Sequence, residues 1–131
     1  MATDSILDTT KKILGISPDD PSFDLDIVTH INSVFFTLQQ LGVGPADGLT
    51  ITDNSAVWSD FIKDSKNINA VKSYMGLKVR LLFDPPSMSF VLDSMKKQVE
   101  EYEWRLEVAV ANYNHVAEMT ELQREEDAIN G

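Results

Sequence analysis

The chain has 131 residues, 43% of them hydrophobic, with 21 acidic and 11 basic side chains and a formal net charge of −10. This acidic balance argues against a nucleic-acid binder, because such affinity comes largely from cationic contacts with phosphate groups. The sequence lacks a membrane span, a basic and apolar signal peptide and any cysteine, so we expect one soluble domain made in a reducing compartment.

Two helices are predicted in the first third of the chain. The first covers residues 4–14, where apolar residues share one face, and Gly15 followed by an apolar residue predicts a Schellman-type ending. The second runs from about 23 to 41, with apolar residues three and four positions apart. Ser22 is its predicted N-cap.

Residues 49–58 have the pattern of a small β-hairpin, with Asp53 and Asn54 at the turn. Trp58 and Phe61 are expected in a short helical turn beneath it. Because an isolated hairpin is marginally stable in water, it must pack on helices or on a neighbouring subunit.

A third long helix is predicted from Asn67 or Asn69 to the double proline at Asp84-Pro85-Pro86. Two adjacent apolar stripes cover most of its surface, so we expect it to be buried. Gly76 weakens the helix by about 1 kcal/mol relative to alanine, and its missing side chain permits close approach of another helix.

The fourth long helix is predicted from Ser87 or Ser89 to about Glu118. A heptad-type seam follows it, formed by Leu92, Met95, Val99, Tyr102, Leu106, Ala109, Tyr113 and Val116. At about 45 Å this helix exceeds the roughly 30 Å width of a small domain, so part of it is expected to project. We therefore predict one helical domain over residues 1–118 and an acidic, frayed tail over residues 119–131.

These elements predict an all-α fold, a four-to-five-helix bundle with a long C-terminal helix and a small β-hairpin insertion. The sequence shows no pattern typical of a catalytic or metal-binding site. His30 and His115 lack ligand spacing, and the aspartates at 19–26 do not fit a calcium loop. We expect no enzymatic activity, no cofactor and no metal.

Trp104 lies off the heptad seam and has two interpretations. It packs against a second helix of the same chain, or it anchors a partner, as large aromatic residues often do. The sequence pattern favours the first interpretation.

Four segments resemble the head–tail connector, or adaptor, proteins of tailed bacteriophages. They are HINSVFFTLQQLGVGP, ITDNSAVWSDF, VKSYMGLKVRLLFDPP and SFVLDSMKKQVEEYEWRL. The resemblance spans roughly residues 5–107 and implies a small, mostly helical subunit that forms a ring, typically of twelve copies. It implies that the ring docks under the portal in the virion neck, after assembly in the host cytoplasm. The ring would extend the DNA channel, without specific DNA binding, and would offer a platform for a second neck or tail-completion protein.

A second hypothesis is a small helical regulator or assembly chaperone that forms a dimer through the heptad seam. Particle size distinguishes a ring from such a dimer. The candidate interface residues are Asp53, Asn54, Trp58, Phe61, Trp104, Tyr113 and Val116.

Overall fold

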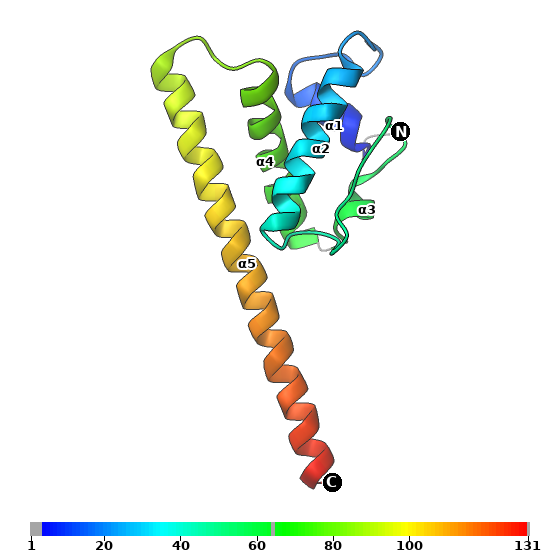
Figure 1. Cartoon of the computed structure of the whole chain (residues 1–131), viewed down its shortest axis with the longest axis vertical. Coiled ribbons are helices and arrows are strands. Elements are labelled where there is room, and N and C mark those ends of the chain that lie inside the picture. The colour runs from blue at the N-terminus through cyan, green and yellow to red at the C-terminus, as the bar shows by residue number, and fades with distance from the viewer. Residues whose placement is uncertain (1–3, 64, 131) are drawn as a thin grey trace.

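The computed structural model describes residues 4–63 and 65–130, without the side chains of residues 65, 112–117 and 130. This part of the chain forms five helices and no strand. The helices are α1 (Ile6–Ile13), α2 (Asp24–Gln40), α3 (Trp58–Phe61), α4 (Ser65–Phe83) and α5 (Ser89–Asn130). Helix α4 contacts α1 and α2 on one side and α5 on the other, and the second half of α5 extends well beyond the remaining helices (Figure 1). The predominantly helical fold is confirmed.

Helices α1 and α2 both end at a glycine in the left-handed region. Gly42 has a φ angle of 84°, and beyond it the Val43 N–H donates to the Leu38 carbonyl at 2.9 Å. This is the hydrogen bond of a Schellman motif, which needs a residue in the left-handed region. Gly15, with a φ angle of 80°, closes α1 in the same way, which confirms the prediction there.

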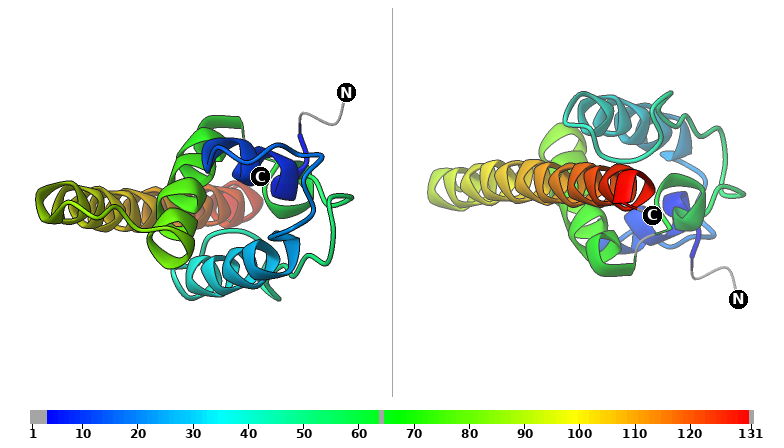
Figure 2. Two further views of the ribbon diagram at one scale, coloured as in Figure 1. Left: turned by 90° about the horizontal axis from the view of Figure 1, so that it is seen from above. Right: turned by 90° about the horizontal axis from the view of Figure 1, so that it is seen from below.

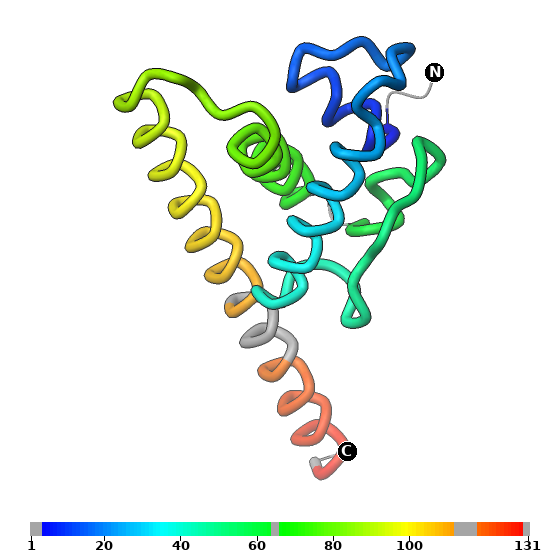
Figure 3. Tube along the Cα trace, turned by 45° about the horizontal axis from the view of Figure 1, so that its top comes forward, coloured from blue at the N-terminus to red at the C-terminus, as the bar shows by residue number. Residues whose placement is uncertain are grey.

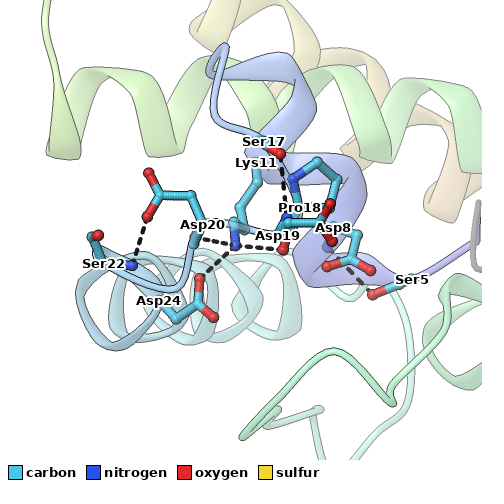
Figure 4. A network of polar contacts seen from close by, with 9 residues as sticks. All are labelled: Ser5, Asp8, Lys11, Ser17, Pro18, Asp19, Asp20, Ser22 and Asp24. Carbon is cyan, nitrogen blue, oxygen red and sulfur yellow. Dashed lines mark hydrogen bonds and ion pairs between the residues drawn. The ribbon is translucent and has the colours of Figure 1, made fainter.

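A buried lysine joins α1 to the start of α2 (Figure 4). Lys11 is only 1% exposed, and its Nζ donates to the carbonyls of Pro18 at 3.1 Å and Asp20 at 2.6 Å. It also pairs with Asp24 Oδ1 at 2.7 Å. A buried ammonium group is stable only with such partners, so these contacts fix the connecting segment. The predicted cap by Ser22 was wrong, because the N-cap falls one residue later and carries no side-chain hydrogen bond.

The predicted β-hairpin at residues 49–58 was wrong. The segment is a loop that rises from the end of α2 to the start of α1 (Figure 3), and other elements satisfy its backbone. The Asn32 side-chain amide donates to the Ile51 carbonyl at 3.0 Å and accepts the Ile51 N–H at 2.8 Å. Ser5 Oγ donates to the Asn54 carbonyl at 2.8 Å. With these partners, the loop needs no strand ladder of its own.

The core lies between α1, α2 and α4, with α3 packed against it. Its fully buried side chains include Ile6, Ile27, Ile31, Phe35, Leu38, Trp58, Val71, Tyr74, Met75 and Val79. Gly76 lies where α4 crosses the end of α1, and a Cβ atom there would be 2.7 Å from Ile13 Cγ2. The prediction that Gly76 permits close approach of another helix is therefore confirmed.

The double proline separates α4 from α5, as predicted, but the expected end of α5 near Glu118 was wrong. The helix continues to Asn130. Residues 119–130 contain no glycine or proline and several strong helix formers, so the chain has no local reason to stop earlier. The division into a domain at 1–118 and a tail at 119–131 stays a prediction. Within the described residues, no helix has the length and apolar character needed to cross a membrane.

Candidate assembly interface

One face of α5 packs inside the chain. Val99 and Leu106 are buried and Tyr102 is half-buried against the core, all on the side of α5 that meets α4. These residues belong to the predicted heptad seam, so α4 occupies that seam in its central part. The side chains of Tyr113 and Val116, which continue the seam, lie outside the described residues.

A polar contact reinforces this packing. The hydroxyl of the fully buried Tyr74 on α4 donates to Glu103 Oε2 on α5 at 2.7 Å, and Lys78 Nζ lies 3.9 Å from the same oxygen. Burial raises the pKa of Tyr74 well above its usual value, and the hydrogen bond and negative charge of Glu103 raise it further. No sequence pattern indicates this contact, because it joins two helices through residues 29 positions apart.

The opposite face of α5 carries large apolar side chains that remain in solvent. Phe90, Trp104, Val108, Met119, Leu122 and Ile129 are between 37% and 83% exposed. At about 100° of rotation per residue, all six fall within about 80° of the helix surface, roughly opposite Val99 and Leu106. We call these six residues the outer stripe. Exposed apolar surface of this extent typically marks an interaction site.

Trp104 belongs to this outer stripe and is 63% exposed. The prediction that it packs against a second helix of the same chain was therefore wrong. Its helix meets α4 on the other side, through Leu106, so no described element covers Trp104. The exposed indole supports the alternative, that Trp104 anchors a partner.

A second exposed apolar face lies on α2. Leu25 is 80% exposed and Phe36 is 60% exposed, whereas Ile27 and Ile31 point into the core. Leu25 and Phe36 are eleven residues apart, which places them on one side of the helix and about 16 Å apart along it. We call these two residues and the surface between them the α2 face.

The remaining predicted interface residues lie in and beneath the 49–58 loop. Asp53 and Asn54 are exposed, and hydrogen bonds from the Ser55 hydroxyl and backbone N–H lower the pKa of Asp53. Trp58 and Phe61 are buried below them, so in this conformation they support the loop without reaching its surface. Contact between the loop and a neighbouring molecule stays a prediction.

Charge is unevenly distributed along α5. The helix carries ten acidic and four basic side chains. Two of the basic residues, Lys96 and Lys97, lie near its start, while residues 118–130 hold five carboxylates and one arginine. The projecting end of the helix is therefore strongly acidic.

Two grooves border α5. One, of about 620 Å³, lies between α4 and α5 and is lined in part by Arg80 and Arg105. The other, of about 560 Å³, lies between α5 and the loops around α3. No histidine lines either groove, and the described residues include no cluster of three or more potential metal ligands.

Comparison with known proteins identifies a family for most of the chain. The sequence model of a family described as phage connector protein matches residues 6–113. This range includes α1 to α4 and the part of α5 that packs on α4. No curated protein and no solved structure gives a significant match.

Proposed function

We propose that this chain, which belongs to the phage connector protein family, is a structural, non-enzymatic virion protein that forms a ring beneath the portal. The ring, of twelve copies as the family resemblance implies, extends the DNA channel and joins the capsid to the tail. Its partners are further copies of itself, the portal protein and a second neck or tail-completion protein. It is assembled in the host cytoplasm and resides in the neck of the virion.

The observation that carries this proposal is the projecting half of α5. Met119, Leu122 and Ile129 lie there on one side of the helix, exposed to solvent. Helices in proteins gain most of their stability from packing an apolar face, and an isolated helix shorter than about 12–15 residues is marginal in water. A projecting helix with an uncovered apolar side supports docking to another molecule.

The charge of the chain suits a channel for DNA. Twelve copies would carry a formal charge of roughly −120, and a lumen with part of that charge would repel the phosphate backbone. This repulsion reduces binding of the DNA to the channel wall while the genome passes. A neutral or basic inner surface in the assembled ring would contradict this part of the proposal.

The alternative, a dimeric regulator or assembly chaperone, depends on a free heptad seam. Val99 and Leu106 of that seam are buried against the chain's own core. A dimer through the same residues would require α5 to separate from α4. The observed packing thus favours the connector.

Reconstitution on capsids tests the proposal. Portal-bearing capsids that lack this protein are mixed with the purified full chain and imaged by cryo-electron microscopy. We expect ring-shaped density beneath the portal, and none on matched capsids without a portal. If the folded chain, checked by circular dichroism, adds no density beneath the portal, the proposal is wrong.

A further inference from the structure

The distribution of charge along the chain points to a contact between copies. We propose that the start of α2 in one copy, with Leu25 and Asp26, docks in the groove between α4 and α5 of the next copy, beside Arg80. The inference rests on the proposed ring and identifies one contact between its subunits. We call this groove the Arg80 groove.

The Arg80 groove, of about 620 Å³, combines apolar side chains with a positive charge. Its apolar residues are Ile13, Leu77, Met95 and Tyr102. Three charged side chains also line it, and two of them, Arg105 and Glu101, pair with each other. Arg80 is half-buried there, and its side chain forms no ion pair or hydrogen bond with a described residue. Because a partly buried charge without a partner is costly, the groove favours an occupant that brings a carboxylate.

Helix α4 is a cationic element in an acidic protein. It carries four basic side chains and no acidic one. Lys72 Nζ lies 3.8 Å from a carboxylate oxygen of Asp4, and Lys78 Nζ lies 3.9 Å from one of Glu103. These two lysines meet carboxylates of their own chain, whereas Arg80 remains available for a carboxylate of another copy.

The complementary surface lies at the start of α2. Residues 13–62 include seven aspartates and no lysine or arginine, so this part of the chain is acidic throughout. Asp26 is exposed and follows Leu25, whose side chain is 80% exposed at one end of the α2 face. Together these two residues offer an apolar side chain for the lining of the groove and a carboxylate for Arg80. Opposite charges that meet across an interface fix its register.

The two surfaces lie on different sides of the molecule. The Arg80 groove opens on the side of α5 where α1 lies, whereas α2 lies on the other side (Figure 2). Leu25 is on the surface of α2 turned away from the buried Ile27 and Ile31. Two different patches on separate sides allow the heterologous contact that closes a ring of identical copies. The start of α2 and the end of α4 also lie at the same end of the molecule (Figure 1), so copies at equal height can meet through them.

Cysteine crosslinking on assembled particles tests the placement, and the sequence contains no cysteine to interfere. Ser22, three positions before Leu25, and Ser73, in the groove, are both exposed. Ser22→Cys and Ser73→Cys are prepared as separate variants, mixed, assembled on portal-bearing capsids and treated with a short bismaleimide. We expect a crosslinked dimer from the mixture and none from either variant alone, and a ladder of linked subunits from a chain with both substitutions. Crosslinks in either variant alone, or none in the mixture, would overturn the contact.

Charge reversal tests the pairing of Arg80 with Asp26. Arg80→Glu and Asp26→Arg should each raise the chain concentration needed for half-maximal ring formation at least about tenfold, because like charges then meet across the contact. The chain with both substitutions should return to within about threefold of the unmodified chain. Lys96→Glu and Asp47→Arg make the same changes of charge at exposed positions outside both surfaces. These matched controls should shift the concentration less than about twofold.

The outcomes separate the contact from its alternatives. Unchanged assembly of Arg80→Glu, or a folded double variant as weak as the single ones, refutes the pairing. If Glu125→Arg rather than Asp26→Arg restores assembly of the Arg80→Glu chain, the groove holds the acidic end of α5 and the α2 contact is wrong. Should Arg80→Glu not fold by circular dichroism, the crosslinks of the conservative serine variants decide alone. If the unmodified chain forms no ring, the proposed function itself fails, whereas a ring without the expected crosslinks refutes this contact alone.

Discussion

Alanine substitutions at Leu106 and Trp104, made one at a time, separate the two faces of α5. The residues are two positions apart, but Leu106 is buried against the core and Trp104 lies mostly in solvent. Leu106→Ala removes buried atoms and leaves a cavity, so we expect it to lower the free energy of unfolding by about 2–5 kcal/mol. Trp104→Ala removes a larger side chain yet should change that free energy by no more than about 0.5 kcal/mol.

The expected difference is large enough to measure in a chain of this size. Since 1 kcal/mol shifts the unfolding midpoint by roughly 3–5 °C, a loss of about 2–5 kcal/mol in Leu106→Ala should lower Tm by about 6–25 °C. Trp104→Ala should move it by about 2 °C or less. Thermal and urea unfolding followed by far-ultraviolet circular dichroism give both quantities, and an unchanged dependence on urea shows that the unfolding reaction itself is the same.

The comparison must be made on the monomer, because ring formation would stabilise any residue at the subunit contact. Light scattering at the working concentration shows whether each protein is monomeric. A loss of stability in Trp104→Ala as large as that in Leu106→Ala would refute the reasoning, since Trp104 would then be buried in solution. Full stability of Leu106→Ala would show that the seam does not hold α5 on α4.

A truncation and two sets of substitutions test other parts of the structure. Ending the chain after Glu118 removes only exposed side chains among those described, so the free energy of unfolding should change by less than about 0.5 kcal/mol, while docking to portal-bearing capsids, seen by microscopy, is lost. Gly76→Ala should destabilise in urea, because overpacking against Ile13 costs about 1–3 kcal/mol and the gain in helix propensity is about 1 kcal/mol. Ile13→Ala in the same chain should remove that loss, and additive effects would contradict the contact. Since the pKa of Tyr74 is raised by folding, its contribution to stability is complete below pH 10.0 and is lost as the pH rises further. Tyr74→Phe should reduce this alkaline loss in urea titrations, and an identical profile in both proteins would contradict the hydrogen bond to Glu103.

Most helix boundaries were predictable because their signals are local. The glycines at 15 and 42 end helices through hydrogen bonds within a few residues, and the double proline blocks a helix wherever it occurs. The seam through Val99 and Leu106 likewise needs only a repeat of three and four residues. Such features depend on neighbouring positions, so one sequence is enough to recognise them.

The errors came from contacts between distant segments. Asn32 satisfies the backbone of Ile51 from a separate helix, and this side-chain amide replaces the hairpin that the alternation at 49–58 predicted. The prediction that Trp104 packs inside the chain was wrong for a related reason. Periodicity shows that α5 has apolar residues on two faces, but it does not show which face the rest of the chain covers.

The outer stripe links the fold to assembly. Tyr74 and Glu103 join α4 to α5, and Leu106 is buried just beyond them, so the direction in which the helix leaves the body is set by the subunit itself. Beyond Glu118 every described side chain is exposed, and contacts such as those of Arg124 with Glu121 and of Gln123 with Asp127 stay within the helix, so these side chains gain no stability from packing on the rest of the chain. A partner that covers Met119 and Leu122 supplies that stability, whereas a partner that met a disordered segment would also bear the entropy of ordering it. In the proposed docking, the body of the subunit therefore fixes the direction of approach and the partner stabilises the end of the helix, so the upper half of α5 is as important as the end that makes the contact.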